Sequence, residues 1–345
     1  MIKALHSYKA LRLPADIIAA LACHGCRLFD DTHVSVLSRG LSNQNYLIRS
    51  EDRQYALRIN SDASSAICHR QSEVANWCLA QDAMLAPQLH YVSADYKYYL
   101  SEFIQVDSDW SQLMTANSAH PLIDCFEPWP QAEKLLLGLL TGLSRLPPPI
   151  NAVSVTGQWT EYLDTLTDFS SRHQLTSSRL GQWFGRYQQL ISRKAQVTNV
   201  LTQLDACMIL PQFSHRDLNP HNLLLKNNQL WCIDFEYACL SHPLVDLASV
   251  LATHRLSTTQ RHWLISNYLH NHPCLTPDAL SAVPAAIELY WYFGCCWALL
   301  MASHILDSDN VETSESSTKQ VISTCHTFDN YIVCFDDFLS LLPEN

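Results

Sequence analysis

The stretch from His215 to Tyr237 concentrates the residue types that phosphoryl transfer requires. Asn222 and Asp234 offer an amide oxygen and a carboxylate oxygen, which are hard ligands suited to an Mg²⁺ ion that also binds phosphates. Asp217 lies five residues before Asn222 and offers a second carboxylate, which can accept the proton of a hydroxyl group. The pattern therefore predicts phosphoryl transfer, with Asn222 and Asp234 as metal ligands and Asp217 as the catalytic carboxylate.

Two apolar runs in this stretch flank a polar turn and predict a β-hairpin. The turn contains Asn227 and Asn228, and asparagine tolerates the left-handed backbone of tight turns. Folding the chain about Asn228 would make Asn222 and Asp234 cross-strand partners, with Cβ atoms about 5 Å apart. We therefore expect the two metal ligands to meet at the open end of the hairpin.

The elements that carry these residues divide the chain into two parts. Residues 1–105 show short strand patterns and one helical pattern, which predict a small antiparallel sheet with a single helix. The predicted strands are 34–38, 45–49, 54–60, 89–93 and 96–104, and the predicted helix is 63–81. This part is expected to be one domain.

Residues 106–345 change in character and predict a larger, mostly helical domain interrupted by the hairpin. The predicted helices are 132–146, 159–169, 179–204, 258–269 and a last one near 321–342. Residues 307–318 are polar and acidic and predict a surface loop. The two parts together indicate an α+β fold.

Composition excludes several classes of protein. The 345 residues carry a net charge of −11, which disfavours a nucleic-acid partner. With only 8 glycines, the chain contains neither a dinucleotide fingerprint nor a P-loop. The 13 cysteines and the lack of a signal-peptide pattern predict a cytoplasmic protein with reduced thiols. The apolar run 289–302 is short for a membrane span, so we expect a buried core helix and no membrane partner.

The spacing H-x-D-x-x-x-x-N, followed by Ile233–Asp234, resembles the catalytic loop and metal strand of the aminoglycoside phosphotransferase and choline kinase family. The resemblance implies a protein-kinase-like fold with two lobes, ATP bound between them, and Mg²⁺ as the metal. His215 would brace the catalytic loop by hydrogen bonding, or take part in proton transfer. Asp246 resembles the structural aspartate of the family, and only 11 residues separate it from Asp234, which favours a small acceptor over a peptide.

Residues upstream extend the resemblance to the nucleotide site. Gly40–Asn43 resembles the family's nucleotide loop, and Arg58 stands where kinases carry the strand lysine, as in choline and thiamine kinases. Glu73 would be the helix partner of Arg58. The nucleotide-binding residues implied by the resemblance are Gly40, Ser42, Asn43, Arg58, Glu73, Glu102 and Ile104.

The acceptor site is implied by aromatic residues. Tyr237 follows the metal strand, and an aromatic ring there could hold a cation. Trp291 and Trp297 resemble residues of the late helix that lines the choline pocket, although the helix also reads as ordinary core. Gly294 and Thr253 stand where choline kinases carry tryptophan and a carboxylate, which leaves thiamine or another cationic alcohol open.

The sequence is therefore interpreted as an ATP- and Mg²⁺-dependent kinase of a small, cationic alcohol such as thiamine or choline. Two alternatives stay open: an aminoglycoside or sugar kinase of the same family, and a non-catalytic nucleotide-binding protein with this fold. The oligomeric state is not predicted.

Overall fold

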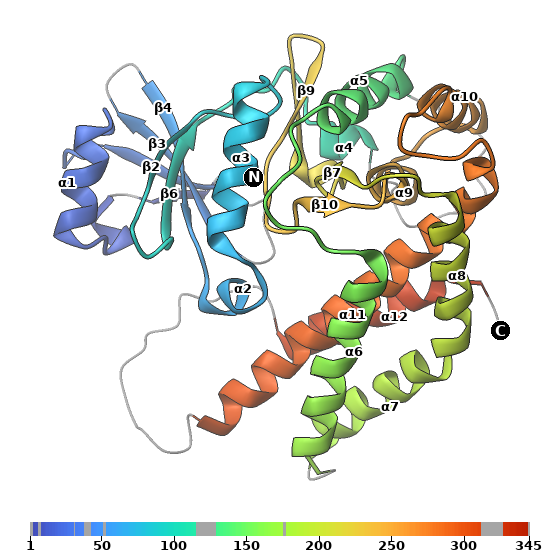
Figure 1. Ribbon diagram of the computed structural model, residues 1–345. Helices are drawn as coiled ribbons and strands as arrows, with labels where there is room; N and C mark the ends of the chain where they lie inside the picture. The colour runs from blue at the N-terminus through green and yellow to red at the C-terminus, as the bar shows by residue number, and fades with distance from the viewer. Residues whose placement is uncertain are drawn as a thin grey trace. The chain divides into compact units, whose positions relative to one another are not determined.

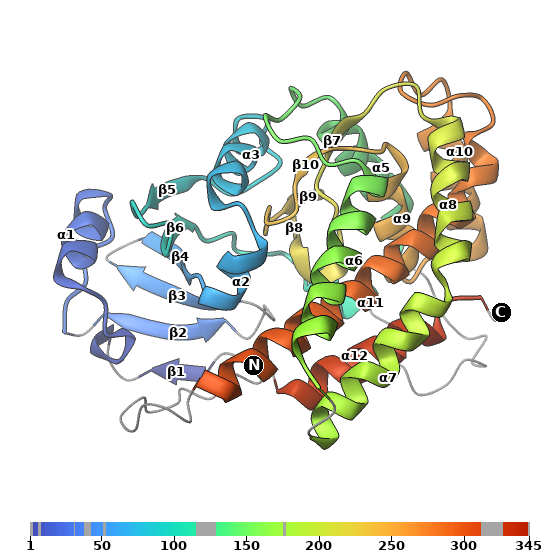
Figure 2. The same ribbon diagram turned by 60° about the horizontal axis from the view of Figure 1, so that its bottom comes forward.

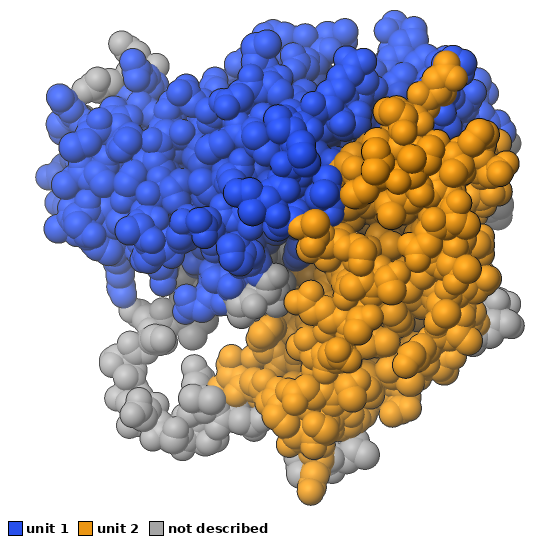
Figure 3. All heavy atoms as spheres, in the orientation of Figure 1, with its two compact units in different colours: residues 1–151, 213–240, 249–270 blue, residues 152–212, 241–248, 271–345 orange. Residues whose placement is uncertain are grey.

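The chain forms two compact units, coloured separately in Figure 3. Unit 1 comprises residues 1–151, 213–240 and 249–270, and unit 2 comprises residues 152–212, 241–248 and 271–345. The predicted domain division at residue 105 falls inside unit 1 and stays a prediction. The computed structural model describes residues 3–5, 8–30, 32–37, 43–50, 53–114, 129–174, 177–311 and 327–343.

Unit 1 contains a six-stranded sheet with the order β1-β2-β3-β4-β6-β5, in which the recorded pairings are antiparallel. Its strands are β1 (Lys3–Leu5), β2 (His33–Leu37), β3 (Gln44–Ser50), β4 (Arg53–Ile59), β5 (Leu89–Val92) and β6 (Tyr98–Glu102). Tyr55 and Leu57 of β4 belong to the buried apolar cluster on one face of this sheet. Because side chains alternate across a strand, Arg58 points to the opposite face. The antiparallel sheet is confirmed, and β1 is a strand that the sequence did not predict.

Helices accompany the sheet in unit 1. They are the 3₁₀ turn η1 (Tyr8–Leu11), α1 (Ala15–Cys23), α2 (Asp62–Ile67) and α3 (Arg70–Asp82), and α3 lies beside the sheet in both views (Figures 1 and 2). The prediction of one helix over 63–81 is wrong, because Cys68 and His69 are extended and His69 starts a new helix by accepting the backbone N–H of Ser72. Helix α1 was not predicted; it buries Ile17 and Leu21.

The hairpin belongs to unit 1 and is held by backbone contacts to earlier segments. It consists of β8 (Leu223–Lys226) and β9 (Gln229–Cys232), preceded by the 3₁₀ turn η2 (Pro220–Asn222). The N–H of Asp107 donates to the carbonyl of Leu225 over 2.9 Å, and the N–H of Cys232 donates to the carbonyl of Leu85 over 2.8 Å. Unit 1 also contains α4 (Trp110–Met114), α5 (Ala132–Ser144) and α10 (Thr258–Leu269), of which α5 and α10 match predicted helices. A separate two-stranded sheet joins β7 (Gln212–Ser214) and β10 (Cys239–Ser241), and α9 spans Leu244–Thr253.

Unit 2 is built mainly of helices. They are α6 (Val155–Arg172), α7 (Ser178–Ser192), α8 (Lys194–Cys207), α11 (Ala279–Val311) and α12 (Phe328–Ser340). The prediction of a single helix over 179–204 is wrong, because the chain turns at Arg193, which ends α7 and starts α8. The last helix is confirmed from Phe328 onward; residues 321–326 lie outside the described part of the chain.

Helix α11 is the long apolar helix of unit 2. By length and composition, Ala279–Ser308 could cross a membrane, and 61% of its apolar window is buried inside the structure. It packs against α6, α7, α8 and α12, so packing within unit 2 accounts for its apolar residues. The acidic loop predicted over 307–318 is wrong at its start, because α11 continues to Val311; residues 312–318 are outside the described ranges.

Candidate active site

The loop that follows β7 is braced by His215, whose side chain is fully buried. Its Nε2 donates to the carbonyl of Ile233 over 3.1 Å, and its Nδ1 accepts the N–H of Asp217 over 3.4 Å. Burial lowers the pKa of His215 to about 4, so the ring is neutral at physiological pH. This geometry favours the bracing role over proton transfer.

The Asp217 carboxylate is fixed by two amide donors. Asn219 Nδ2 donates to Oδ1 and Asn222 Nδ2 donates to Oδ2, each over 2.8 Å. Burial raises the pKa of Asp217, and these hydrogen bonds counter part of that increase. Asn219 also caps η2, since its Oδ1 accepts the N–H of His221 over 2.9 Å. Asn219 was not among the residues predicted from the sequence, although the Asn219–Pro220 pair is a turn signal that marks this position.

The hairpin register differs from the prediction by one residue. Asn227 and Asn228 both have positive φ, at 52° and 56°, which is the two-residue turn that suits the twist of a hairpin. The turn is therefore centred between the two asparagines, and Leu223 pairs with Cys232. The predicted pairing of Asn222 with Asp234 is wrong, because Asn222 faces Ile233, whose N–H donates to the Asn222 carbonyl over 3.0 Å.

Asp234 follows the end of β9 in a left-handed conformation, with φ at 70°. Its Oδ1 lies 3.1 Å from Nη1 of Arg58, and 28% of its side chain is exposed. Burial and then the neighbouring Glu236 carboxylate raise the pKa of Asp234. A nearby cation would stabilise the ionised form of such a carboxylate, and the ionised form is the one that binds a metal.

Two glutamates and two arginines form a buried ring next to Asp234, which we name the charged ring: Arg58, Glu73, Arg70 and Glu236. Arg58 Nη2 lies 2.6 Å from Glu73 Oε1 and 2.8 Å from Glu236 Oε1. The predicted pairing of Arg58 with Glu73 is thus present. Burial raises the pKa of Glu236, but the charges of Arg58 and Arg70 outweigh it and hold that pKa below its ordinary value.

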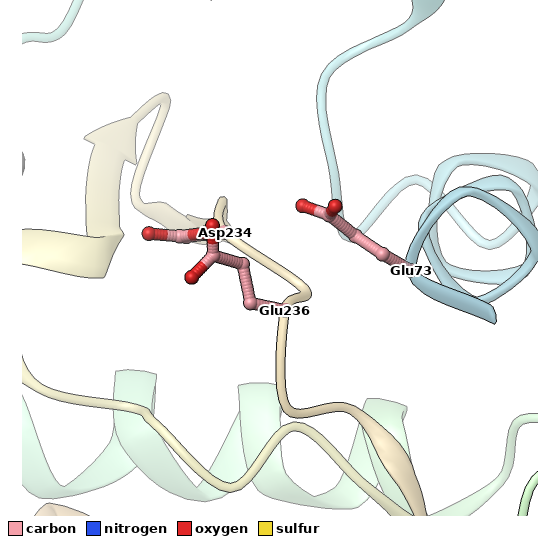
Figure 4. A group of neighbouring side chains, drawn as sticks. All are labelled: Glu73, Asp234 and Glu236. Carbon is pink, nitrogen blue, oxygen red and sulfur yellow. The ribbon is translucent and has the colours of Figure 1, made fainter. Parts of the chain in front are cut away.

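Figure 4 shows Glu73 reaching from α3 toward Asp234 and Glu236, which come from the segment after β9. One carboxylate oxygen from each of the three lies within 4.8 Å of the others. Three residues of this cluster were not predicted from the sequence: Glu236, Arg70 and Ser64, whose Oγ donates to Glu236 over 2.7 Å. Arg70 stands three residues before Glu73 on one helix face, and this spacing was the available signal.

The nucleotide loop is described only at its last residue, since Gly40 and Ser42 lie outside the described ranges. Asn43 Nδ2 donates to Glu236 Oε1 over 2.5 Å, and Asn43 Oδ1 accepts the N–H of Ser61 over 3.2 Å. The structure therefore links the end of this loop to the charged ring.

Two further residues that the resemblance assigns to the nucleotide site, Glu102 and Ile104, lie where β6 ends. Glu102 is the last residue of β6, and its N–H donates to the carbonyl of Gln88 over 2.8 Å. Ile104 follows in an irregular segment with a buried side chain. Their role toward a nucleotide stays a prediction.

The predicted acceptor residues fall in both units. Tyr237 is half-buried in the turn after Glu236, in unit 1. In unit 2, Trp291 stacks on Phe338 with ring centroids 5.6 Å apart, and Trp297 meets Tyr331 edge-on at 5.5 Å. Both partners belong to α12, so the half-buried rings of these tryptophans pack between α11 and α12.

Gly294 faces Phe338 of α12, as Trp291 does, and at this position α11 has no room for a second tryptophan. A Cβ atom at this position would lie 2.9 Å from the Phe338 ring, so α12 fills the space that a larger side chain would need. This contact favours the core-packing interpretation of the aromatic helix.

Sequence comparison finds a curated relative that matches about two thirds of this chain. This relative, Protein LicA of Haemophilus influenzae, is 24% identical over 235 residues, which are 66% of this chain and 60% of LicA. The chain therefore spans about three fifths of the length of that relative.

Solved structures of low sequence identity show the same fold. The ethanolamine kinase of Plasmodium vivax is 15% identical with a TM-score of 0.62, covering 91% of this chain and 83% of that one. The choline kinase LicA of Streptococcus pneumoniae is 15% identical with a TM-score of 0.55, covering 88% and 92%. An ADP-bound aminoglycoside phosphotransferase, APH(2'')-Ib, is 15% identical with a TM-score of 0.54, covering 94% and 99%. The predicted kinase-like α+β fold is thus confirmed.

The family itself is shown by a match over most of the sequence. Residues 33–277 match the phosphotransferase enzyme family, APH, and this range includes the catalytic loop, the hairpin and the charged ring. The chain belongs to the phosphotransferase enzyme family.

Proposed function

We propose that the protein is an ATP- and Mg²⁺-dependent kinase that phosphorylates the hydroxyl group of a small cationic alcohol such as thiamine or choline. One observation carries this proposal: the Asp217 carboxylate is fixed by the Asn222 amide at the mouth of a hairpin whose other side continues to Asp234. Phosphoryl transfer requires a positioned carboxylate beside oxygen ligands for a metal, and this arrangement supplies both.

Arg58 is the proposed contact for the nucleotide phosphates. Its Nη1 faces Asp234, whereas Nε and Nη2 are held by Asn60 over 2.6 Å and by the glutamates of the charged ring. Of the three carboxylates that Arg58 contacts, Asp234 at Nη1 is the most exposed, at 28% against 0% for Glu73 and 2% for Glu236. A bound ADP in a similar aminoglycoside phosphotransferase structure supports a nucleotide substrate.

The remaining nucleotide contacts follow from the resemblance to the family. Gly40, Ser42 and Asn43 would cover the phosphates through their backbone, and Glu102 and Ile104 would border the base.

Asn222 and Asp234 have the donor chemistry that Mg²⁺ prefers. The Nδ2 of Asn222 is engaged with Asp217, which leaves its amide oxygen as the ligand atom. Asp234 is a partly exposed carboxylate whose pKa is raised by burial and by Glu236, so a cation would stabilise its ionised form. Mg²⁺ bound there would neutralise charge on the β- and γ-phosphates of ATP.

Asp217 orients the acceptor hydroxyl and takes its proton. As the hydroxyl oxygen forms a bond to the γ-phosphorus, the bond from that phosphorus to the bridging oxygen breaks and ADP leaves. The raised pKa of Asp217 makes its carboxylate a better proton acceptor, and Asn219 and Asn222 keep it in one orientation.

Tyr237 is the proposed contact for the positive charge of the acceptor. It stands three residues after Asp234 in a turn, and an aromatic face attracts a cation. Similar structures named as choline and ethanolamine kinases support a cationic alcohol. For Trp291 and Trp297 the acceptor contact stays a prediction from the family resemblance, and in the structure their rings pack against α12.

We also propose that the protein works in the cytoplasm, where ATP and reduced thiols coexist. The cysteines in the described part of the chain are free thiols.

ADP release tests the proposed activity. Purified protein is incubated with ATP, Mg²⁺ and, in turn, thiamine, choline, ethanolamine, an aminoglycoside or a neutral sugar. We expect release to depend on a cationic alcohol and on Mg²⁺. Preference for the aminoglycoside or the sugar would favour the second kinase class, and nucleotide binding without any turnover would favour a non-catalytic protein.

A further inference from the structure

A second arginine contacts two of the three carboxylates that Arg58 contacts. Arg70 is the first residue of α3, and its side chain is 7% exposed. Its Nη1 lies 2.8 Å from Glu73 Oε2 and 2.9 Å from Glu236 Oε1. Its Nη2 donates to Ser64 Oγ, and that hydroxyl donates to Glu236. Arg70 is therefore fixed on both sides by groups that are themselves buried.

The contacts of Arg58 and Arg70 close into a ring of alternating charge. Glu73 divides its oxygens, with Oε1 on Arg58 and Oε2 on Arg70. Glu236 gives one oxygen, Oε1, to both arginines. The ring joins β4, α3 and the segment after β9, so it ties together three elements that carry the proposed nucleotide and metal ligands.

The charge balance explains what Arg70 does in this ring. Two arginines balance Glu73 and Glu236, which leaves the Nη1 edge of Arg58 for Asp234 and for incoming phosphates. Without Arg70, Glu73, Glu236 and Asp234 would all compete for one guanidinium group. A buried carboxylate that loses its partner is strongly destabilised. The remaining cation of the charged ring, Arg58, would then be attracted more strongly to Glu73 and Glu236.

We propose that Arg70 is a positioning residue for nucleotide binding: it holds Glu73 and Glu236 in the charged ring and so keeps Arg58 directed toward the phosphates. This inference rests on the proposed kinase function. It predicts that Arg70 affects nucleotide affinity through charge, and that relieving the excess negative charge should compensate for its loss.

Nucleotide binding tests this role without relying on turnover. The affinity for a fluorescent ADP analogue is measured with and without Mg²⁺ for the wild type, Arg70→Met, Arg70→Lys and the double variant Arg70→Met/Glu236→Gln. We expect Arg70→Met to weaken binding about tenfold, because members of one ion network are strongly coupled. Arg70→Lys should recover part of the loss, and the double variant should bind more tightly than Arg70→Met.

A matched control separates this role from general damage. Arg172→Met removes an exposed arginine that pairs with Asp168 over 2.9 Å in unit 2, and its nucleotide affinity should equal that of the wild type. If Arg70→Met does not fold, Arg70→Lys and the double variant still provide the comparison. The acceptor KM, measured on the folded variants, should change less than twofold.

The outcomes distinguish the inference from the proposed function. Arg70→Met binding the analogue as tightly as the wild type would overturn the inference alone. A double variant no better than Arg70→Met would also overturn it, because a purely structural role predicts additive damage. A wild-type protein that binds no nucleotide would overturn the proposed function and the inference with it.

Discussion

The Asn222 amide donates to the Asp217 carboxylate, with 2.8 Å between Nδ2 and Oδ2. This contact joins the residue proposed to take the hydroxyl proton to the residue proposed to hold the metal. It also fixes the direction of both side chains, because the amide nitrogen is turned toward Asp217 and the amide oxygen away from it. The proposed catalytic carboxylate and the proposed metal ligand are thus positioned by one another.

Asp217→Asn should remove most turnover and leave nucleotide binding near that of the wild type. The amide cannot accept the hydroxyl proton, and a positioned proton acceptor contributes about 10²–10⁴-fold to the rate. Steady-state turnover and binding of a fluorescent ADP analogue measure the two effects. Wild-type turnover in this variant would show that Asp217 is not the proton acceptor.

Asp234→Ala should abolish the Mg²⁺ dependence of nucleotide binding. Asn222 alone is a neutral ligand with one oxygen, which is a weak site for a hard dication. The analogue is titrated with and without Mg²⁺, and Asp168→Ala serves as the control because Asp168 is exposed in unit 2. If Mg²⁺ strengthens binding to Asp234→Ala as much as to the wild type, Asp234 is not a metal ligand.

Tyr237 variants test the charge of the acceptor. A cation over a phenol ring gains about 0.5–2 kcal/mol, so Tyr237→Ala should raise the acceptor KM roughly 2- to 30-fold and leave the ATP KM nearly unchanged. Tyr237→Phe should keep most of the affinity, whereas Tyr237→Leu should lose it, because only phenylalanine retains an aromatic face. Equal acceptor KM values for all three variants would reject the cation contact and leave the kinase assignment in place.

Gly294 tests whether the aromatic helix is core. Gly294→Ala adds a methyl group against the Phe338 ring, and overpacking of about 1–3 kcal/mol should outweigh the gain of about 0.5–1 kcal/mol from a better helix former. Gly185→Ala is the matched control, since no atom lies within 4 Å of its added Cβ and the free energy of unfolding should rise. Urea denaturation measures both variants, and equal stabilisation by the two substitutions would contradict close packing of α11 on α12.

Buried His254 should make the protein less stable in mild acid. Its Nε2 accepts the indole N–H of Trp110 over 3.0 Å, and burial lowers its pKa to about 3. Between about pH 6.5 and 3, His254 therefore binds a proton in the unfolded chain but not in the folded chain. The stability that is present above about pH 6.5 is lost progressively as the pH falls toward 3.

The free energy of unfolding between pH 6.5 and 4.5 measures this effect. His254→Gln should reduce its slope by about 1.4 kcal/mol per pH unit, which corresponds to one proton. His262→Gln changes an exposed histidine and should leave the slope as in the wild type. An unchanged slope in His254→Gln would assign the acid sensitivity to other groups.

The sequence predicted most of the sheet and the catalytic loop, because both depend on local patterns. Strands β3 and β4 are short β-branched and aromatic runs bounded by turn residues, which one sequence window can show, and the positions of Asp217 and Asn222 follow from loop spacing. The hairpin register was missed by one residue because two asparagines in a row allow the turn centre to shift by half a residue.

The charged ring could not be predicted in full, because it depends on contacts between distant segments. Arg58 and Glu236 are 178 positions apart in the chain, and Arg70 and Glu236 are 166 apart. The break between α2 and α3 also depends on tertiary context, since nothing in the apolar pattern of 63–81 stops a helix at Cys68. The pairing of Arg58 with Glu73 was implied by the family resemblance, and the spacing of Arg70 and Glu73 was the further signal that the sequence offered.

Detection of the phosphorylated product tests the central claim most directly. ³¹P NMR is recorded on wild-type protein with ATP, Mg²⁺ and a small cationic alcohol such as thiamine or choline, beside the same mixture with Asp217→Asn. The account predicts a new phosphate-ester signal that grows as the γ-phosphate signal of ATP declines, and no such signal with the variant. Loss of the γ-phosphate signal only to inorganic phosphate, or an equal ester signal with Asp217→Asn, would contradict it.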